Sequence, residues 1–375
     1  MHLGYLSVGV ILLLASSFLD NTRGPMMPLL SEVFGLTYTQ RGLFFVLGNF
    51  ASVLGTFLLI PLSQYISERA ISLSLFAACS LLVLSSWTIE STVGLWPFAI
   101  GLGAFISMAG AASNLCVLRA TDVHDRSRAM SLIHLAYGTG SFFSPVIVSL
   151  LLSRGFSWQA IPCFVLLPCL FGIFILLHKI SPLSHEEPIE KQKMLLNGRQ
   201  IYIVITFAIY VAGEVVTSAW MSSYLVGAKG LTLEEAAKWL TGFFILMAIT
   251  RAACFLRLKD RTEKIILLSS LFASAVFFAL GHQGWLWGFV FAGVLGPFFP
   301  LFMARVSRDF PEQSKTLTLW VLTVMQATLG VFNFGVGASA DAYGIAVVYW
   351  LPAGLLILSD LMLLRYFMTQ KNPHG

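Results

Sequence analysis

The chain of 375 residues is 57% hydrophobic and only 11% charged, whereas a soluble domain carries about 25% charged residues. This composition excludes a soluble globular domain and a disordered chain, and it predicts a membrane protein. The net charge of +5 does not indicate a nucleic-acid partner, because the basic residues follow the membrane topology described below.

Twelve apolar segments are expected to cross a bilayer as helices, which takes about 20 residues each. The longest polar stretch divides them six and six. We therefore expect an all-α polytopic membrane protein with twelve transmembrane helices in two six-helix pseudo-symmetric halves, residues 1–180 and 201–375, joined by a cytoplasmic linker, 181–200. The expected spans are Leu3–Val33, Gly42–Ile66, Ile71–Ile89, Gly94–Leu118, Ala129–Ser153, Trp158–Ile180, Ile201–Val226, Trp239–Leu258, Ile265–Leu280, Trp285–Ala304, Leu317–Ala340 and Ile345–Met368.

Orientation follows from the distribution of Lys and Arg, which favour cytoplasmic loops. With the N-terminus inside, the cytoplasmic segments hold 17 of these residues and the outer loops hold 4. Both termini are therefore predicted to be cytoplasmic. Judged from the compactness of the chain, we expect a multi-pass protein of the cell inner membrane, and a monomer.

The first span contains two charged residues, Asp20 and Arg23, within an otherwise apolar sequence. A charge near the bilayer centre costs roughly 2.5–3.5 kcal/mol, so such residues usually face a bundle interior or an aqueous cavity. Their spacing of three places them on one helix face, within pairing distance.

The two halves of the sequence resemble each other. Gly35-Leu-Thr37 follows the first span and Gly230-Leu-Thr232 follows the seventh, with Asp20 and Glu214 preceding them by 15 and 16 residues. The fourth and tenth spans also end alike, at Arg119 and Arg305. These three patterns, in matching order, indicate an internal repeat of six helices. Many transporters are built from two such repeats, with the binding site between them.

The whole chain resembles the major facilitator superfamily of secondary transporters. Lys259-Asp-Arg261 is similar to the core of the family's cytoplasmic motif, and Glu68-Arg69 to a degraded first copy without the usual glycines. The segment from Tyr210 to Glu214, with Trp220 after it, is similar to the seventh helix of the fucose/glucose–proton symporter-like branch. The resemblance implies that two halves rock about a central site, and that Glu68, Arg69, Asp260 and Arg261 form a cytoplasmic gate. The alternative for Asp260 and Arg261 is a plain charged turn that fixes topology.

Asp20 and Glu214 are the candidate proton-coupling residues, because a carboxyl group in a partly dry cavity can bind a proton on one side of the cycle and release it on the other. The alternative for Asp20 is a permanent ion pair with Arg23 that braces the first helix. Glu214 has no basic neighbour in its own span, which favours a functional role.

Candidate solute contacts are a cation, an aromatic residue and three amides inside spans: Arg23, Asn114, Trp220, Gln326 and Asn333. Arg23 could hold an anionic group through a two-pronged hydrogen bond, whereas amides in helix bundles commonly serve only to join helices. His134 is a possible proton relay; the alternative is a histidine that is hydrated or bonded to a carbonyl. Arg251 is expected to extend to the cytoplasmic surface.

Nothing in the sequence indicates an enzyme. There is no nucleotide-binding loop, no metal-ligand spacing and no nucleophile with a matched base, so neither a cofactor nor a metal is expected. The preferred hypothesis is proton-coupled uptake of a small polar solute, a sugar or an organic acid, by alternating access. The alternatives are a proton antiporter that exports amphipathic compounds or drugs, and a receptor that kept the transporter fold.

Overall fold

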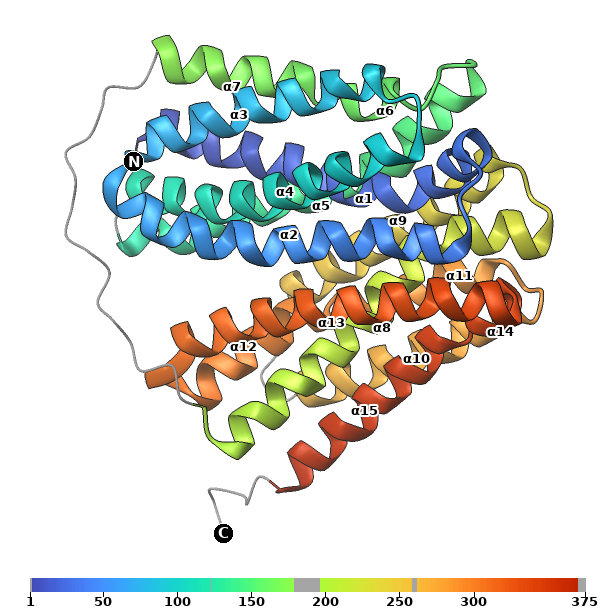
Figure 1. Ribbon diagram of the computed structural model, residues 1–375. Coiled ribbons are helices and arrows are strands. Elements are labelled where there is room, and N and C mark those ends of the chain that lie inside the picture. The colour runs from blue at the N-terminus through green and yellow to red at the C-terminus, as the bar shows by residue number, and fades with distance from the viewer. Residues whose placement is uncertain (1, 122, 179–195, 258–261, 370–375) are drawn as a thin grey trace.

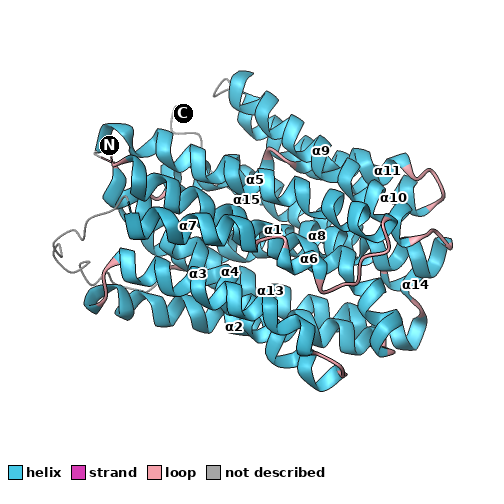
Figure 2. Ribbon diagram, turned by 90° about the horizontal axis from the view of Figure 1, so that it is seen from above, coloured by secondary structure: helices cyan, strands magenta, loops and turns pink. Residues whose placement is uncertain are grey.

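The computed structural model describes residues 2–121, 123–178, 196–257 and 262–369 (Figure 1), and these contain helices and loops but no strand (Figure 2). The first part of the chain forms α1 (Leu3–Phe34), α2 (Tyr38–Tyr65), α3 (Glu68–Ser85), η1 (Ser86–Thr88), α4 (Thr92–Ala120), α5 (Val123–Ser153), α6 (Ala160–Cys163) and α7 (Leu166–His178). The second part forms α8 (Gly198–Lys229), α9 (Leu233–Arg257), α10 (Glu263–His282), α11 (Trp287–Phe291), η3 (Ala292–Leu295), α12 (Phe298–Asp309), η4 (Pro311–Gln313), α13 (Ser314–Tyr343), α14 (Ile345–Val348) and α15 (Leu351–Thr369).

Among the described residues, 12 helical segments are long and apolar enough to cross a membrane, and each coincides with an expected span. Six of them precede residue 179 and six follow residue 195, which confirms the predicted fold class. The tenth segment is interrupted, because η3 separates α11 from α12 just before Pro297. Most of the linker expected at 181–200 lies outside the described residues.

The repeated Gly-Leu-Thr sequence has a structural reason. Gly35 and Gly230 end α1 and α8 in the left-handed conformation, with φ of 65° and 67°, which glycine adopts without the strain a side chain would cause. Thr37 and Thr232 then cap α2 and α9, each accepting a hydrogen bond from the third residue after it. The side-chain oxygens of Gln40 and Glu235 in turn accept a hydrogen bond from the N–H group of the threonine, which completes a capping box at each turn.

We call the end of the bundle with these two turns the turn end, and the opposite end, where α1 begins and α15 ends, the terminal end (Figure 1). The halves are in close contact from the middle of α1 to the turn end. A Cβ atom at Gly24 on α1 would lie 2.9 Å from Cα of Ala219 on α8. Likewise, a Cβ atom at Gly42 on α2 would lie 2.7 Å from the carbonyl oxygen of Asn333 on α13. Toward the terminal end, α8 and α15 lean away from the first six spans (Figure 1).

Within the first half, small residues let α5 approach α1. A Cβ atom at Gly140 would overlap the Ser17 hydroxyl and lie 2.7 Å from the Leu14 carbonyl oxygen, whereas one at Gly138 would meet nothing within 4 Å. Only Gly140 is therefore required for the contact, although both glycines lie on the same helix.

This difference gives a test of the packing. Gly140→Ala is expected to lower the free energy of unfolding by about 1–3 kcal/mol, because the added methyl group overpacks the α1–α5 interface. Gly138→Ala is expected to be neutral or stabilising by up to roughly 1 kcal/mol, because alanine favours the helix. Thermal unfolding of the purified protein, followed by tryptophan fluorescence, measures both. Equal shifts in the two variants would contradict the packing.

Candidate functional site

Asp20 lies near the middle of α1, a helix of 32 residues, and both of its carboxylate oxygens have partners. One oxygen forms an ion pair with Nη2 of Arg23, one turn further along. The other accepts a hydrogen bond from the hydroxyl of Tyr137 on α5, at 3.0 Å. Arg23 also donates from Nε to the Asp20 carbonyl oxygen. The two charges therefore neutralise each other inside the membrane-spanning part of the first half.

One nitrogen of Arg23 remains available. Its Nη1 atom is buried and has no hydrogen-bond partner among the described residues. The guanidinium group lies 5.7 Å from the centroid of the Phe45 ring on α2, and a Cβ atom at Gly48 would lie 3.1 Å from Nη1. Arg23 thus occupies a space that α2 leaves by carrying a glycine at position 48.

Glu214 lies near the middle of α8, which also has 32 residues. Its carboxylate accepts a hydrogen bond from the hydroxyl of Tyr210, one turn earlier. It also interacts electrostatically with Arg251 on α9. Nε of Arg251 donates to the carbonyl oxygen of Gly296 at 3.0 Å, so this side chain is held inside the second half. The expectation that Arg251 extends to the surface was wrong, because the interruption before α12 leaves a backbone carbonyl free to accept its hydrogen bond.

The two sets of residues form one group across the halves. Tyr137 interacts electrostatically with Glu214 as well as with Asp20, and α1 packs directly on α8 at Gly24. We call this group the polar cluster; its members are Asp20, Arg23, Tyr137, Tyr210, Glu214 and Arg251. It holds two basic side chains, two acidic side chains near the middle of equivalent 32-residue helices, and two tyrosine hydroxyls bonded to the acids.

Two of the predicted solute contacts are bonded to each other. Trp220 on α8 is fully buried, and its indole N–H donates to the Asn333 side-chain oxygen on α13 at 2.8 Å. Asn333 in turn donates to the Leu329 carbonyl oxygen at 2.9 Å. The Trp220 ring packs against Phe45 and Tyr38 of α2, so this pair contributes to the contact between halves near the turn end.

The other predicted polar residues lie apart from these bonds. Asn114 on α4 is exposed, and its side chain donates to the Gly110 carbonyl oxygen of its own helix at 3.1 Å. His134 on α5 is also exposed and interacts electrostatically with Arg251. Gln326 is partly exposed on α13, without a side-chain hydrogen bond in the described part of the chain.

The predicted gate residues are only partly described. Glu68 is buried at the start of α3, and Nε of Arg69 donates to the Leu176 carbonyl oxygen of α7 at 3.0 Å, within one half. Asp260 and Arg261 lie outside the described residues.

The sequence analysis missed a charge cluster at the terminal end of the second half. Glu263, the first residue of α10, is buried and forms ion pairs with Arg305 and Arg308 of α12. Asp309 pairs with Arg305 and accepts a hydrogen bond from Tyr366 of α15 at 2.7 Å. The signal was present in the repeat, because Thr262-Glu263 begins the ninth span as Ser67-Glu68 begins the third.

A second feature missed from the sequence joins the halves at the turn end. The Asp341 carboxylate, near the end of α13, accepts hydrogen bonds from the backbone N–H groups of Tyr38 and Thr39, at 2.9 and 2.7 Å. These N–H groups belong to the first turn of α2, where a negative charge is favourable. We call this contact the Asp341 latch.

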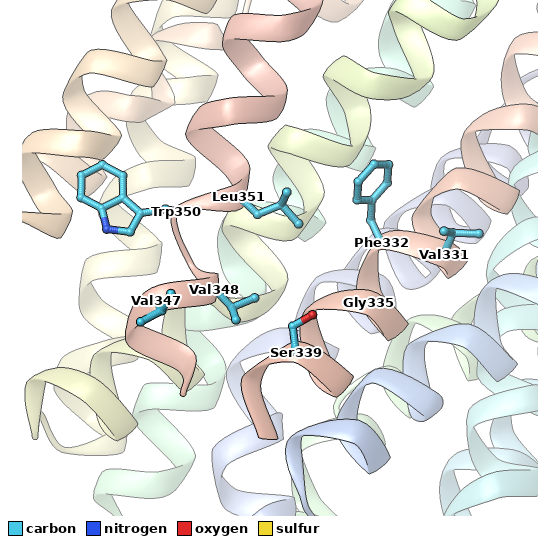
Figure 3. A pocket seen from close by; sticks show the side chains of 8 residues that line it. All are labelled: Val331, Phe332, Gly335, Ser339, Val347, Val348, Trp350 and Leu351. Atoms are coloured by element: carbon cyan, nitrogen blue, oxygen red, sulfur yellow. The ribbon is translucent and has the colours of Figure 1, made fainter. Parts of the chain in front are cut away.

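A groove of about 560 Å³ lies between α13 and the segment formed by α14 and the start of α15 (Figure 3). Its walls are mainly apolar, with Val331, Phe332 and Val347 among them. Val331 and Val347 are 71% and 64% exposed, so we assign the groove to the lipid-facing surface. Among the described residues no group of three or more His, Cys, Asp or Glu could hold a metal ion.

Comparisons with known proteins agree with this architecture. A family model described as the Major Facilitator Superfamily matches residues 9–333, whereas no curated protein matches. The fold is similar to that of a bacterial homolog of the human lysosomal transporter Spinster in an inward-facing and occupied conformation, at 12% identity, with 99% of each chain covered and a TM-score of 0.79. The fold is also similar to that of a D-xylose–proton symporter, at 12% identity, with 98% of each chain covered and a TM-score of 0.79. A third similar structure is that of the nucleoside transporter NupG, at 14% identity. The match covers 98% of this chain and 100% of that chain, with a TM-score of 0.73.

Loss of the Asp341 latch should open the turn end. Asp341→Asn removes the charge and one acceptor, which we expect to weaken closure by about 1.5–3 kcal/mol, the usual value of a hydrogen bond to a charged group. Spin labels at the exposed residues Ser153 and Gln283, one on each half at the turn end, measure the separation after the native cysteines are replaced. The long-distance population should rise.

The control for the latch is Gln40→Ala. It removes the capping-box partner of Thr37 within α2 but no bond between the halves. Its distance distribution should match that of the parent protein; a shift as large as that of Asp341→Asn would show that helix capping, not the latch, sets the separation.

Proposed function

Because the chain belongs to the major facilitator superfamily of transporters, we propose that it takes up a small polar solute together with protons by alternating access. The solute class we propose is a sugar or an organic acid. The observation that supports this most directly is the polar cluster, which holds two carboxylates on α1 and α8 where the two halves meet. We further propose a monomer in the cell inner membrane with both termini cytoplasmic, with 1–180 and 201–375 as the moving units and 181–200 as their linker.

Glu214 is best suited to carry the proton. Among the described residues, Glu214 is bonded to the Tyr210 hydroxyl and lies in the field of the more distant Arg251 charge. Arg251 has its own hydrogen bond to the Gly296 carbonyl oxygen, which does not depend on the charge of Glu214. Protonation of Glu214 therefore leaves Arg251 with its hydrogen bond to the backbone. Protonation also removes a charge from the membrane interior while the halves move. Each such charge costs roughly 2.5–3.5 kcal/mol.

Asp20 differs because protonating it would break the ion pair with Arg23. Arg23 is only 11% exposed, and leaving it unpaired there is costly. An anionic or strongly accepting group of the solute would compensate by bonding to the guanidinium. We therefore propose that Asp20 and Arg23 couple proton binding to solute binding, with Tyr137 holding the carboxylate in position.

The conformation supports alternating access. The turn end is closed by the Asp341 latch and by Trp220 on Phe45. With the topology predicted from Lys and Arg, this is the outer end, so the described state faces inward. Asn114, Gln326 and His134, which are exposed or partly exposed, are the further candidates for solute contact and proton relay. Trp220 and Asn333, bonded to each other, would reach the solute only after the outer end opens.

Glu214→Gln tests the proton role. Thermal shift with a panel of sugars and organic acids first identifies a stabilising solute. In proteoliposomes an imposed pH gradient, acidic outside, should drive accumulation of that solute by the parent protein and not by the variant. Exchange of labelled for unlabelled solute should persist in the variant, because exchange needs no net proton movement.

The control for this experiment is Glu90→Gln, an exposed acid between η1 and α4, which should keep gradient-driven uptake. Unchanged accumulation by Glu214→Gln would refute the assignment of Glu214. Solute expelled rather than accumulated by the parent protein would favour the export alternative.

A double-mutant cycle separates coupling from bracing at Asp20. Asp20→Asn should destabilise the protein by up to about 3–5 kcal/mol, because it leaves Arg23 buried without its ion pair. Asp20→Asn combined with Arg23→Gln should regain most of the melting temperature while gradient-driven uptake stays absent. Recovery of both stability and uptake in the double variant would mean that the pair only braces α1.

A further inference from the structure

A second cavity, of about 250 Å³, lies at the turn end between α1, α2 and α8. The lining residues that matter here are Ser31 and Glu32 of α1, Tyr38 and Arg41 of α2, and Ser223 and Gly227 of α8. None of these belongs to the polar cluster. The cavity is smaller than the roughly 300–1,000 Å³ of a site for a drug-sized ligand, so it suits a molecule of a few heavy atoms.

Two polar groups in the wall of this cavity have no partner. The Ser223 hydroxyl is buried, with 1% of the residue exposed, and makes no hydrogen bond among the described residues. Nε of Arg41 is likewise buried and unbonded there, although the guanidinium carbon lies 4.2 Å from the centroid of the Tyr38 ring. Buried polar groups are nearly always satisfied in native proteins, so two unbonded donors on residues that line one cavity point to a ligand.

The charges around the cavity restrict the class of ligand. Arg41 offers a fork that matches a carboxylate, whereas Glu32, exposed at the edge of the cavity, offers an acceptor for a cation. Asp341 also interacts electrostatically with Arg41. A simple anion would leave Glu32 without a cation, and a simple cation would leave the Arg41 fork without an anion. A small zwitterion satisfies both signs at once.

The site requires both halves, because α1 and α2 belong to the first and α8 to the second. Separation of the halves at the turn end would move Ser223 away from Arg41 and divide the cavity. A ligand that binds only the closed arrangement shifts the equilibrium toward it. We propose that this cavity is a second binding site, for a small zwitterion of amino-acid size, and that its occupation holds the turn end closed.

The test uses the purified full chain in lipid nanodiscs, with spin labels at Ser153 and Gln283 as above. Glycine, β-alanine and glycine betaine are the zwitterionic probes, and acetate and methylammonium are the single-charge probes. Each is added at up to about 10 mM, which covers a dissociation constant in the millimolar range. At least one zwitterion should increase the short-distance population, and neither single-charge probe should do so.

The chain supplies a matched pair of variants. Ser222 and Ser223 are adjacent, both buried and both without a hydroxyl partner among the described residues, but only Ser223 lines the cavity. Ser223→Ala should weaken the effect of the zwitterion about tenfold or more, as expected for a lost hydrogen bond to a charged group. Ser222→Ala should leave it unchanged. Arg41→Lys should weaken it as well, because lysine cannot present the fork.

Three outcomes would overturn the proposal. They are no change in distance with any zwitterion, equal effects of Ser222→Ala and Ser223→Ala, and closure by acetate alone, which would make the site one for simple anions. The readout does not depend on transport, so it is independent of the experiments on Glu214.

Discussion

The structure depends on one constraint, which is that a charge placed in the membrane interior must be neutralised or bonded by the protein itself. The polar cluster meets this constraint with local partners. Asp20 forms an ion pair with Arg23 of its own helix and accepts a hydrogen bond from Tyr137 of α5. Glu214 accepts a hydrogen bond from Tyr210 of its own helix. Because each acid is bonded first within its own half, the halves can move relative to each other without stripping either acid of all its partners. Across the boundary, Tyr137 interacts electrostatically with Glu214 and does not form a hydrogen bond with it among the described residues.

The internal repeat places the two acids at matching depths. Each half begins with a 32-residue helix that ends in a left-handed glycine and turns through a threonine cap into the next helix. The acid lies near the middle of that helix in both halves. The same repeat places Glu68 and Glu263 at the start of the third helix of each half, both buried. The geometry of one half therefore accounts for much of the other. The halves differ in that Asp20 has an arginine one turn along its own helix, whereas the arginine that acts on Glu214 comes from α9.

Much of the fold could be predicted because hydropathy reports directly on membrane spans: the segments around Asp20 and Glu214 were found from composition alone. The partners of these acids were harder to predict. Tyr137 reaches Asp20 across 117 positions of sequence, and Asp341 reaches Tyr38 across 303. Neither pairing produces a periodic pattern, since each arises from how helices of separate spans pack. Trp220 and Asn333 were recognised as unusual residues, but nothing local indicates that they bond to each other. Glu263 is the exception, since comparison of Ser67-Glu68 with Thr262-Glu263 would have identified it.

The alternating access proposed above requires that the Asp341 latch can be released. Without Asp341, α2 keeps its own capping box, which serves the N–H groups of Thr37 and Gln40. The N–H groups of Tyr38 and Thr39 lose their acceptor. What is lost is the interaction across the halves, with the packing of Trp220 on Phe45 and the glycine contacts beside it. Inverting a two-state population from 1:99 to 99:1 takes about 5.5 kcal/mol, and one charge crossing 100 mV supplies about 2.3 kcal/mol. The two hydrogen bonds that Asp341 accepts are worth about 1.5–3 kcal/mol each, so together they are of this order, and Trp220 packs on Phe45 and Tyr38 beside them. The proton and solute proposed above could reverse such a closure, whereas a fully apolar interface would hold the halves together too strongly.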